Sequence, residues 1–143
     1  MRPAGFLLAP LLAFAWPGAS AAESFAPRLY EVTTETGLPH LEENLRYATT
    51  RARLCLGEKQ LASAFPILQH QALKGCRLDH QHRDGEAVVL ILTCEGSETT
   101  GAAHWQVDSL GIRGTLDVRL GGKNMTFYQR MSGRPLGECA PGD

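Results

Sequence analysis

Three histidines fall where the chain is richest in strand-forming residues, and their spacing could hold a metal ion. His80 and His82 are separated by a single residue. On a β-strand such a pair points to one face, with the two side chains roughly 6 to 7 Å apart. His104 would face the same way if the turn over 95–99 kept one particular register, and imidazole suits both copper and zinc. A metal-binding protein that uses these histidines is therefore the alternative function that the sequence offers.

The residues beside His104 favour a different register for that turn. A shift of one residue turns every side chain of a strand to the opposite face, so it would bury Trp105 and Val107 and send His104 to the solvent. Burying a Trp and a Val stabilises a fold by several kcal/mol more than burying a His. We therefore expect solvated histidines near the end of a hairpin.

Side chains that could form a hydrolase site are present, but they make no recognisable constellation. Such a site needs a nucleophile, a base and an oxyanion-stabilising group within mutual reach. His104, Asp108 and Ser109 are close in sequence, yet their spacing matches no nucleophile-elbow pattern, and Ser109 is predicted to lie in a turn. The sequence thus predicts a protein that is not an enzyme and that uses no cofactor.

The first 22 residues have the build of a signal peptide. A single basic residue, Arg2, precedes an apolar run over 4–16, and small residues follow over 19–22, which is the order found in secretory signals. The apolar run is shorter than the roughly 20 residues that span a bilayer. We expect cleavage after Ala21 or Ala22 on a Sec-type route. The product is predicted to be one periplasmic or secreted domain over 23–143 with no membrane span.

The charge pattern argues against a nucleic-acid partner. The chain has 14 Lys and Arg against 15 Asp and Glu, a formal net charge of −1, and no basic cluster is evident along it. Proteins that bind nucleic acid need clustered Lys and Arg to neutralise phosphates.

Four cysteines are present, and they are Cys55, Cys76, Cys94 and Cys139. An even number of cysteines in a small exported chain is typical of a disulfide framework. Structural zinc sites use close Cys spacings that this chain lacks. We expect two disulfides, and three pairings are open on the sequence alone.

Alternating apolar residues and turn residues predict an almost entirely β-structure. We expect one short helix over 58–65, stopped by Pro66. The predicted strands cover 29–36, 45–56, 76–82, 86–94, 100–108, 112–120 and 124–131.

Asp84-Gly85 is a dipeptide favoured in tight hairpin turns because it tolerates positive φ. With a three-residue loop of the glycine-bulge kind, Cys76 lies opposite Cys94 and close enough for a disulfide. A two-residue loop would place a threonine opposite Cys76 instead. If the first register holds, Cys55 is left to pair with Cys139 and to fasten the C-terminal tail.

Gly121-Gly122 is a good two-residue turn between the last two strands. That turn would place Val118 opposite Met125 and Leu116 opposite Phe127, so that the apolar residues share one side. The predicted fold class is mainly β: an antiparallel meander that forms a twisted sheet or a partly closed barrel, with one short helix and two disulfides.

The motifs LYEVTTET, CLGEKQL, LTCEG, TTGAA and MSGRPLGEC follow one another in that order. Together with the four cysteines they resemble a family of small exported bacterial proteins, the domain-of-unknown-function family 3617. Tyr30 stands where that family's pattern has a Trp. The resemblance implies an exported β-rich domain and brings no activity with it. Arg134, in the last motif, is expected to hold the tail through a carboxylate or carbonyl contact.

The function that these features favour is non-enzymatic binding on the sheet. Curled antiparallel sheets of this size can form cavities for apolar ligands, and an open sheet edge can bind a protein partner. The residues predicted to face such a ligand are Leu78, Leu90, Leu116, Val118 and Phe127.

Overall fold

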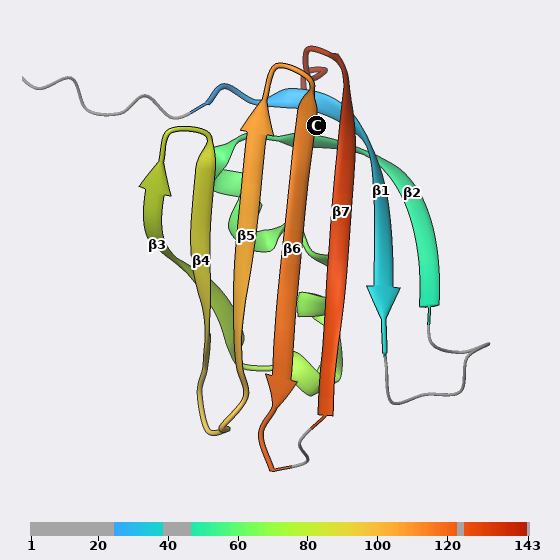
Figure 1. The fold of residues 1–143 in the computed structure, drawn as a ribbon. Coiled ribbons are helices and arrows are strands. Elements are labelled where there is room, and N and C mark those ends of the chain that lie inside the picture. Colours follow the sequence, from blue (N-terminus) through green and yellow to red (C-terminus); the bar gives the residue numbers. More distant parts are fainter. Residues whose placement is uncertain (1–24, 39–46, 123–124, 143) are drawn as a thin grey trace, which may run out of the picture.

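The computed structural model describes residues 25–38, 47–122 and 125–142 and places them in one seven-stranded antiparallel sheet (Figure 1). The strands are β1 (Arg28–Gly37), β2 (Tyr47–Leu56), β3 (Cys76–Asp84), β4 (Ala87–Cys94), β5 (Thr100–Asp108), β6 (Gly111–Leu120) and β7 (Met125–Gly137). They are hydrogen-bonded in the order β2-β1-β7-β6-β5-β4-β3. The predicted fold class, an antiparallel meander in a mainly β-structure, is confirmed. The predicted signal peptide lies outside the described residues.

The alternation of β6 shows why the sheet forms with one apolar face. Ile112, Leu116 and Val118 are buried, whereas Arg113 and Asp117 between them are exposed. Successive side chains of a strand point to opposite faces, so one face of the sheet becomes apolar and the other charged.

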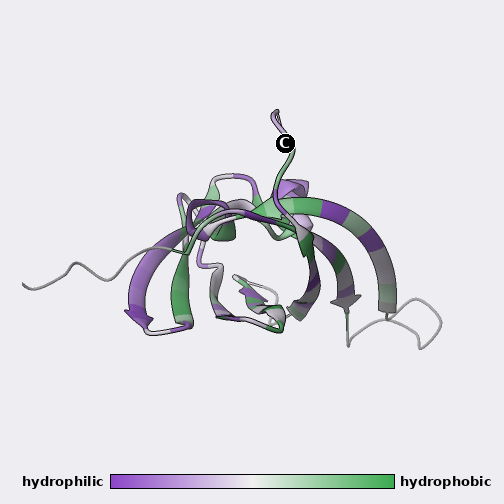
Figure 2. Ribbon diagram, turned by 90° about the horizontal axis from the view of Figure 1, so that it is seen from above, coloured by the Kyte–Doolittle hydropathy of each residue, from purple (hydrophilic) through white to green (hydrophobic). Residues whose placement is uncertain are grey.

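The sheet is curved into an arch, and Figure 2 shows the segment between β2 and β3 lying in its concave side. This segment contains three 3-10 helices, η2 (Glu58–Ser63), η3 (Pro66–Gln69) and η4 (Gln71–Leu73). Their apolar residues, with Phe65 between η2 and η3, pack onto the concave face and close the core: Leu61, Phe65 and Leu73 are at most 1% exposed.

A break at Phe65 separates η2 from η3, so the predicted helix over 58–65 is replaced by several short turns. Phe65 is extended, with φ −76° and ψ 115°. The residue before a proline is driven out of the helical region by the proline ring, so the first helical turn ends there and the next begins at Pro66. Phe65 is then free to pack against Trp105, with 4.9 Å between the ring centroids.

The β3–β4 hairpin pairs Cys76 with Cys94 as predicted, but it does so through a bulge in β3 and not through the predicted three-residue loop. Cys76 lies opposite Cys94, whereas the loop is a two-residue turn closed by Asp84 and Ala87. A β-bulge at Gln81 shifts the register between these two points. A bulge adds one residue to one strand, so it replaces the extra loop residue that we predicted.

The β6–β7 connection is two residues longer than the predicted turn at Gly121-Gly122. Phe127 lies opposite Val118 rather than Leu116, and Met125 no longer faces Val118. A shift of two residues leaves every side chain on its original face, which is why the apolar side was predicted correctly although the pairs were not.

The last strand runs on to Gly137, six residues beyond the predicted end. Gly133 and Pro135, which the prediction left outside the strand, both fit into the sheet. A Cβ at Gly133 would lie 2.5 Å from Cγ2 of Ile112 and 3.3 Å from Cβ of Tyr30, so only glycine allows these two side chains to close over the strand. Pro135 lies opposite Tyr30, where a register shift interrupts the β1–β7 ladder. Such irregularities tolerate a residue without an N–H.

Both predicted disulfides are confirmed. Cys76 and Cys94 join β3 to β4, with their Cα atoms 4.0 Å apart. Cys55 of β2 joins Cys139 beyond β7, with 5.6 Å between the Cα atoms. Because β1 lies between β2 and β7, the second bridge fastens the tail across the start of β1. Disulfides persist in oxidising compartments and are rare in the cytoplasm, so this framework indicates a non-cytoplasmic location.

Candidate functional site

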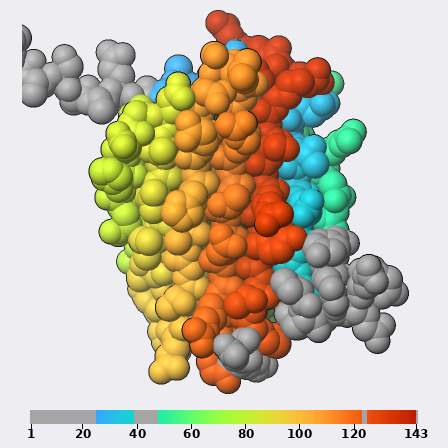
Figure 3. Space-filling view, viewed as in Figure 1, coloured from blue at the N-terminus to red at the C-terminus, as the bar shows by residue number. Residues whose placement is uncertain are grey.

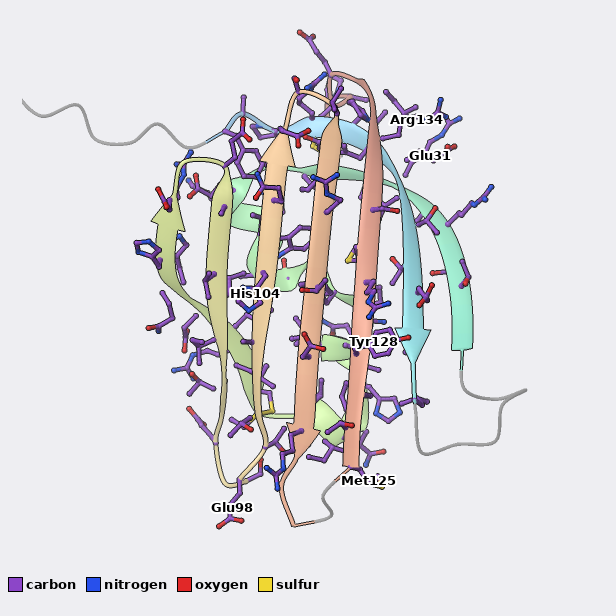
Figure 4. The ribbon with its side chains drawn as sticks, in the orientation of Figure 1. Glu31, Glu98, His104, Met125, Tyr128 and Arg134 are labelled. Carbon is purple, nitrogen blue, oxygen red and sulfur yellow. A yellow bond between two sulfur atoms is a disulfide. The ribbon has the colours of Figure 1, made fainter. Side chains whose placement is uncertain are left out.

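The bulge in β3 places the two neighbouring histidines on opposite faces of the sheet. His80 is paired with Leu90, a core residue, whereas His82 is paired with Val89. Val89 is in turn paired with His104, which belongs to the convex face (Figure 4). The prediction that His80 and His82 share a face is therefore wrong, because one extra residue between them reverses the alternation.

His104 and Trp105 take the faces that the second register predicted. Trp105 is 2% exposed, His104 is exposed and Val107 is half-buried. Among the residues that the structure describes, no group of three His, Cys, Asp or Glu side chains could hold a metal ion. The geometry that the metal-binding alternative requires is not formed there.

The five side chains predicted to face a ligand are part of the hydrophobic core. They line the concave face, but η2, η3 and the residues around them cover that face, and all five are between 0% and 6% exposed. Their apolar character is used for packing against Leu61, Phe65 and Leu73.

A pocket of about 360 Å³ opens at one end of the arch, where the start of β1, the β3–β4 turn and the end of β5 meet. We call it the end pocket. Its walls are formed by Phe25, Ala26, Arg28, Tyr30, Arg83, Gly85, Glu86, Val88, Val107, Asp108 and Ser109. Three strands supply apolar side chains to these walls: Tyr30 belongs to β1, Val88 to β4 and Val107 to β5. Val88 is paired with Trp105 of β5, and Val107 lies two residues after Trp105 on the same face of the sheet.

Charged groups surround the apolar part of the end pocket. Arg83 Nη1 donates a hydrogen bond of 3.0 Å to Glu58 Oε2, and both side chains are at most 20% exposed. This ion pair neutralises the charge nearest to the core. Arg28 and Asp108 lie on the rim with opposite signs. Asp108 accepts hydrogen bonds from the backbone N–H groups of Leu110 and Gly111 and lies 3.5 Å from Arg113 Nη2.

Burial and the neighbouring charges of the end pocket both affect the phenol of Tyr30. Its side chain is 1% exposed. Burial raises the pKa of the Tyr30 phenol above its ordinary value, the charge of Arg28 lowers it, and the charge of Asp108 raises it further. The phenol is therefore held in its neutral form against the apolar wall of the end pocket.

Sequence reasoning did not identify Val88 and Tyr30 as pocket residues, for two different reasons. Val88 has the same alternation as Leu90, a predicted ligand-facing residue, and extending that face to the end of the strand would have found it. Tyr30 carried no such signal, because its place depends on the pairing of β1 with β7, which are about a hundred residues apart in the chain.

Among the described residues, no helix is both long enough and apolar enough to cross a membrane. No curated protein and no solved structure matches the chain. A family model described as "Protein of unknown function (DUF3617)" matches residues 25–139, which include all seven strands and both disulfides. The chain therefore belongs to the DUF3617 family, as its motifs and four cysteines predicted.

Proposed function

We propose that the protein is a non-enzymatic exported protein that acts in the periplasm or outside the cell and binds a small, largely apolar ligand. The end pocket carries this proposal. Its volume of about 360 Å³ falls in the range of roughly 300 to 1,000 Å³ that is usual for small-molecule sites.

The lining of the end pocket sets the chemistry of the ligand. Phe25, Val88 and Val107 supply an apolar wall beside the ring of Tyr30, and burying apolar ligand surface against them is favourable. Arg28 on the rim can bind a polar or acidic end group by charge-assisted hydrogen bonds. An amphipathic molecule with a short apolar chain satisfies both parts.

The location is supported by the signal-like first 22 residues and by the two disulfides. Export would deliver the reduced chain to a compartment where both bridges can form.

Native mass spectrometry of the exported, oxidised protein tests the function. We expect a copurified small molecule, or uptake of one equivalent of dodecanoate, the probe. Val107→Trp should abolish the added mass, because the indole fills the pocket. Thr115→Trp, on the convex side of β6, is the matched control and should bind as the parent does.

Two outcomes would overturn the proposal. One is a protein that carries no small molecule and takes up no dodecanoate. The other is a Val107→Trp variant that binds as well as the parent. The oxidised mass and far-UV circular dichroism of each variant confirm that the fold is intact.

A further inference from the structure

One row of side chains crosses four strands on the convex face, the face turned to the viewer in Figure 3. Arg51 of β2 lies opposite Thr33 of β1, which lies opposite Ser132 of β7, which lies opposite Arg113 of β6. Directly opposed side chains share a face, so the row has a guanidinium at each end and two hydroxyls between. Since neighbouring strands lie about 4.8 Å apart, the two arginine Cα atoms are roughly 14 Å apart. We call this set the convex row.

Two hollows of the surface adjoin the convex row. Their volumes are about 420 Å³ and about 270 Å³, and both are lined by Thr33, Arg113 and Ser132. The first hollow adds Arg134, and the second adds Arg130. The row is therefore the wall between two adjoining depressions, with arginines around both.

The two arginines of the convex row, and Arg134 beside it, keep donors free for a ligand. Arg134 Nη2 contacts Glu31 Oε1 at 2.9 Å (Figure 4), and Arg113 Nη2 lies 3.5 Å from Asp108 Oδ2. Both arginine side chains are nevertheless about 70% exposed. A guanidinium has five donors, so one acidic contact leaves most of them available. Arg51 forms no salt bridge within the part of the chain that the structure describes.

The electrostatic field at the β1–β2 end of the row favours negative charge. The hydrogen bond from Arg134 and then its charge lower the pKa of Glu31, and the charges of Arg51 and Arg53 lower it further. Three arginines thus act on one carboxylate, and their field would act in the same way on a second acidic group.

We infer that the convex row binds an extended, hydroxylated molecule with two acidic groups, such as an acidic oligosaccharide or a sugar phosphate. Guanidinium forks at the two ends bind carboxylate or phosphate oxygens through paired hydrogen bonds. Thr33 and Ser132 between them can donate to and accept from sugar hydroxyls. The row lies on the face of the sheet opposite to the core, and its two hollows share a single lining residue, Asp108, with the end pocket.

Calorimetric titration of the exported protein at low salt tests the site with three probes. Trigalacturonate carries carboxylates, fructose 1,6-bisphosphate carries phosphates, and maltotriose is neutral. We expect binding of at least one acidic probe, weakened at high salt by screening, and no binding of maltotriose. The acidic probe that binds identifies the acidic group.

Paired variants locate the binding. Arg51→Gln with Arg113→Gln removes both ends of the convex row and should weaken binding by about tenfold or more, since hydrogen bonds to charged groups are lost at both ends. Arg77→Gln with Arg119→Gln makes the same change of charge elsewhere on the convex face, and should leave the affinity within about twofold. Ser132→Glu places a carboxylate in the middle of the row and should abolish binding.

Any one of the following results would overturn the inference. The first is that neither acidic probe binds. The second is that the control pair loses as much affinity as the row pair, which would show a diffuse charge effect. The third is that maltotriose binds as well as the acidic probes, or that Ser132→Glu binds them unchanged.

Discussion

The two disulfides should contribute unequally to stability, because they close loops of different length. Cys55 and Cys139 are 84 residues apart, whereas Cys76 and Cys94 are 18 apart. When a bridge acts by restricting the unfolded chain, loops of these lengths correspond to about 4.6 and about 3.2 kcal/mol at 25 °C. Each double variant keeps only one of the two bridges, so neither bridge shortens the other's loop. We therefore expect the Cys55→Ser, Cys139→Ser variant to be less stable than the Cys76→Ser, Cys94→Ser variant by about 1.4 kcal/mol.

Urea unfolding measures this difference. Trp105 is the one tryptophan after residue 22, and its buried indole reports on the core. With a slope of about 1 to 3 kcal/mol per molar urea, the midpoints of the two variants should differ by roughly 0.5 to 1.4 M. Mass spectrometry verifies that each variant keeps its other bridge. The chain-entropy reasoning is refuted if the Cys76→Ser, Cys94→Ser variant is as unstable as the other, or less stable.

Three more predictions follow from particular contacts. Gly114→Ala should lower the free energy of unfolding by about 1 to 3 kcal/mol, because its Cβ would lie 2.5 Å from ring carbons of Trp105; urea unfolding measures the loss. The Tyr30 phenol should titrate above pH 10, with folding stability falling as the pH rises towards its raised pKa; the difference in absorbance at 295 nm between the parent and Tyr30→Phe tests this. Arg134→Gln should raise the pKa of Glu31 towards its ordinary value of 4.5, as carbon NMR of the carboxyl can follow; the stability that Glu31 contributes should be present above that pH and lost as the pH falls through its lowered pKa.

The contact between Arg134 and Glu31 shows how much of an ion pair can be predicted from the type of one residue. The expectation that Arg134 contacts a carboxylate or carbonyl is confirmed by its 2.9 Å ion pair. Which carboxylate accepts could not be predicted, because Glu31 is 103 residues away in the sequence. The same limit applies to the convex row: its members come from four strands, so no basic cluster is visible along the chain.

Local patterns in the sequence determined the strands and the apolar side of the sheet, whereas the pairing of the four cysteines also required the bulge in β3. The strands and the apolar side depend on the alternation of side chains and on turn residues, which act over a few neighbouring positions. The tertiary structure alone decided the bulge at Gln81, the docking of β1 on β7 and the folding of 58–73 over the concave face. The docking of β1 and the folding of 58–73 are fixed by packing between segments distant in the chain, where the burial of a large apolar surface outweighs local preference. For that reason the predicted ligand-facing leucines became core, and the candidate sites lie at the end of the arch and on its convex face.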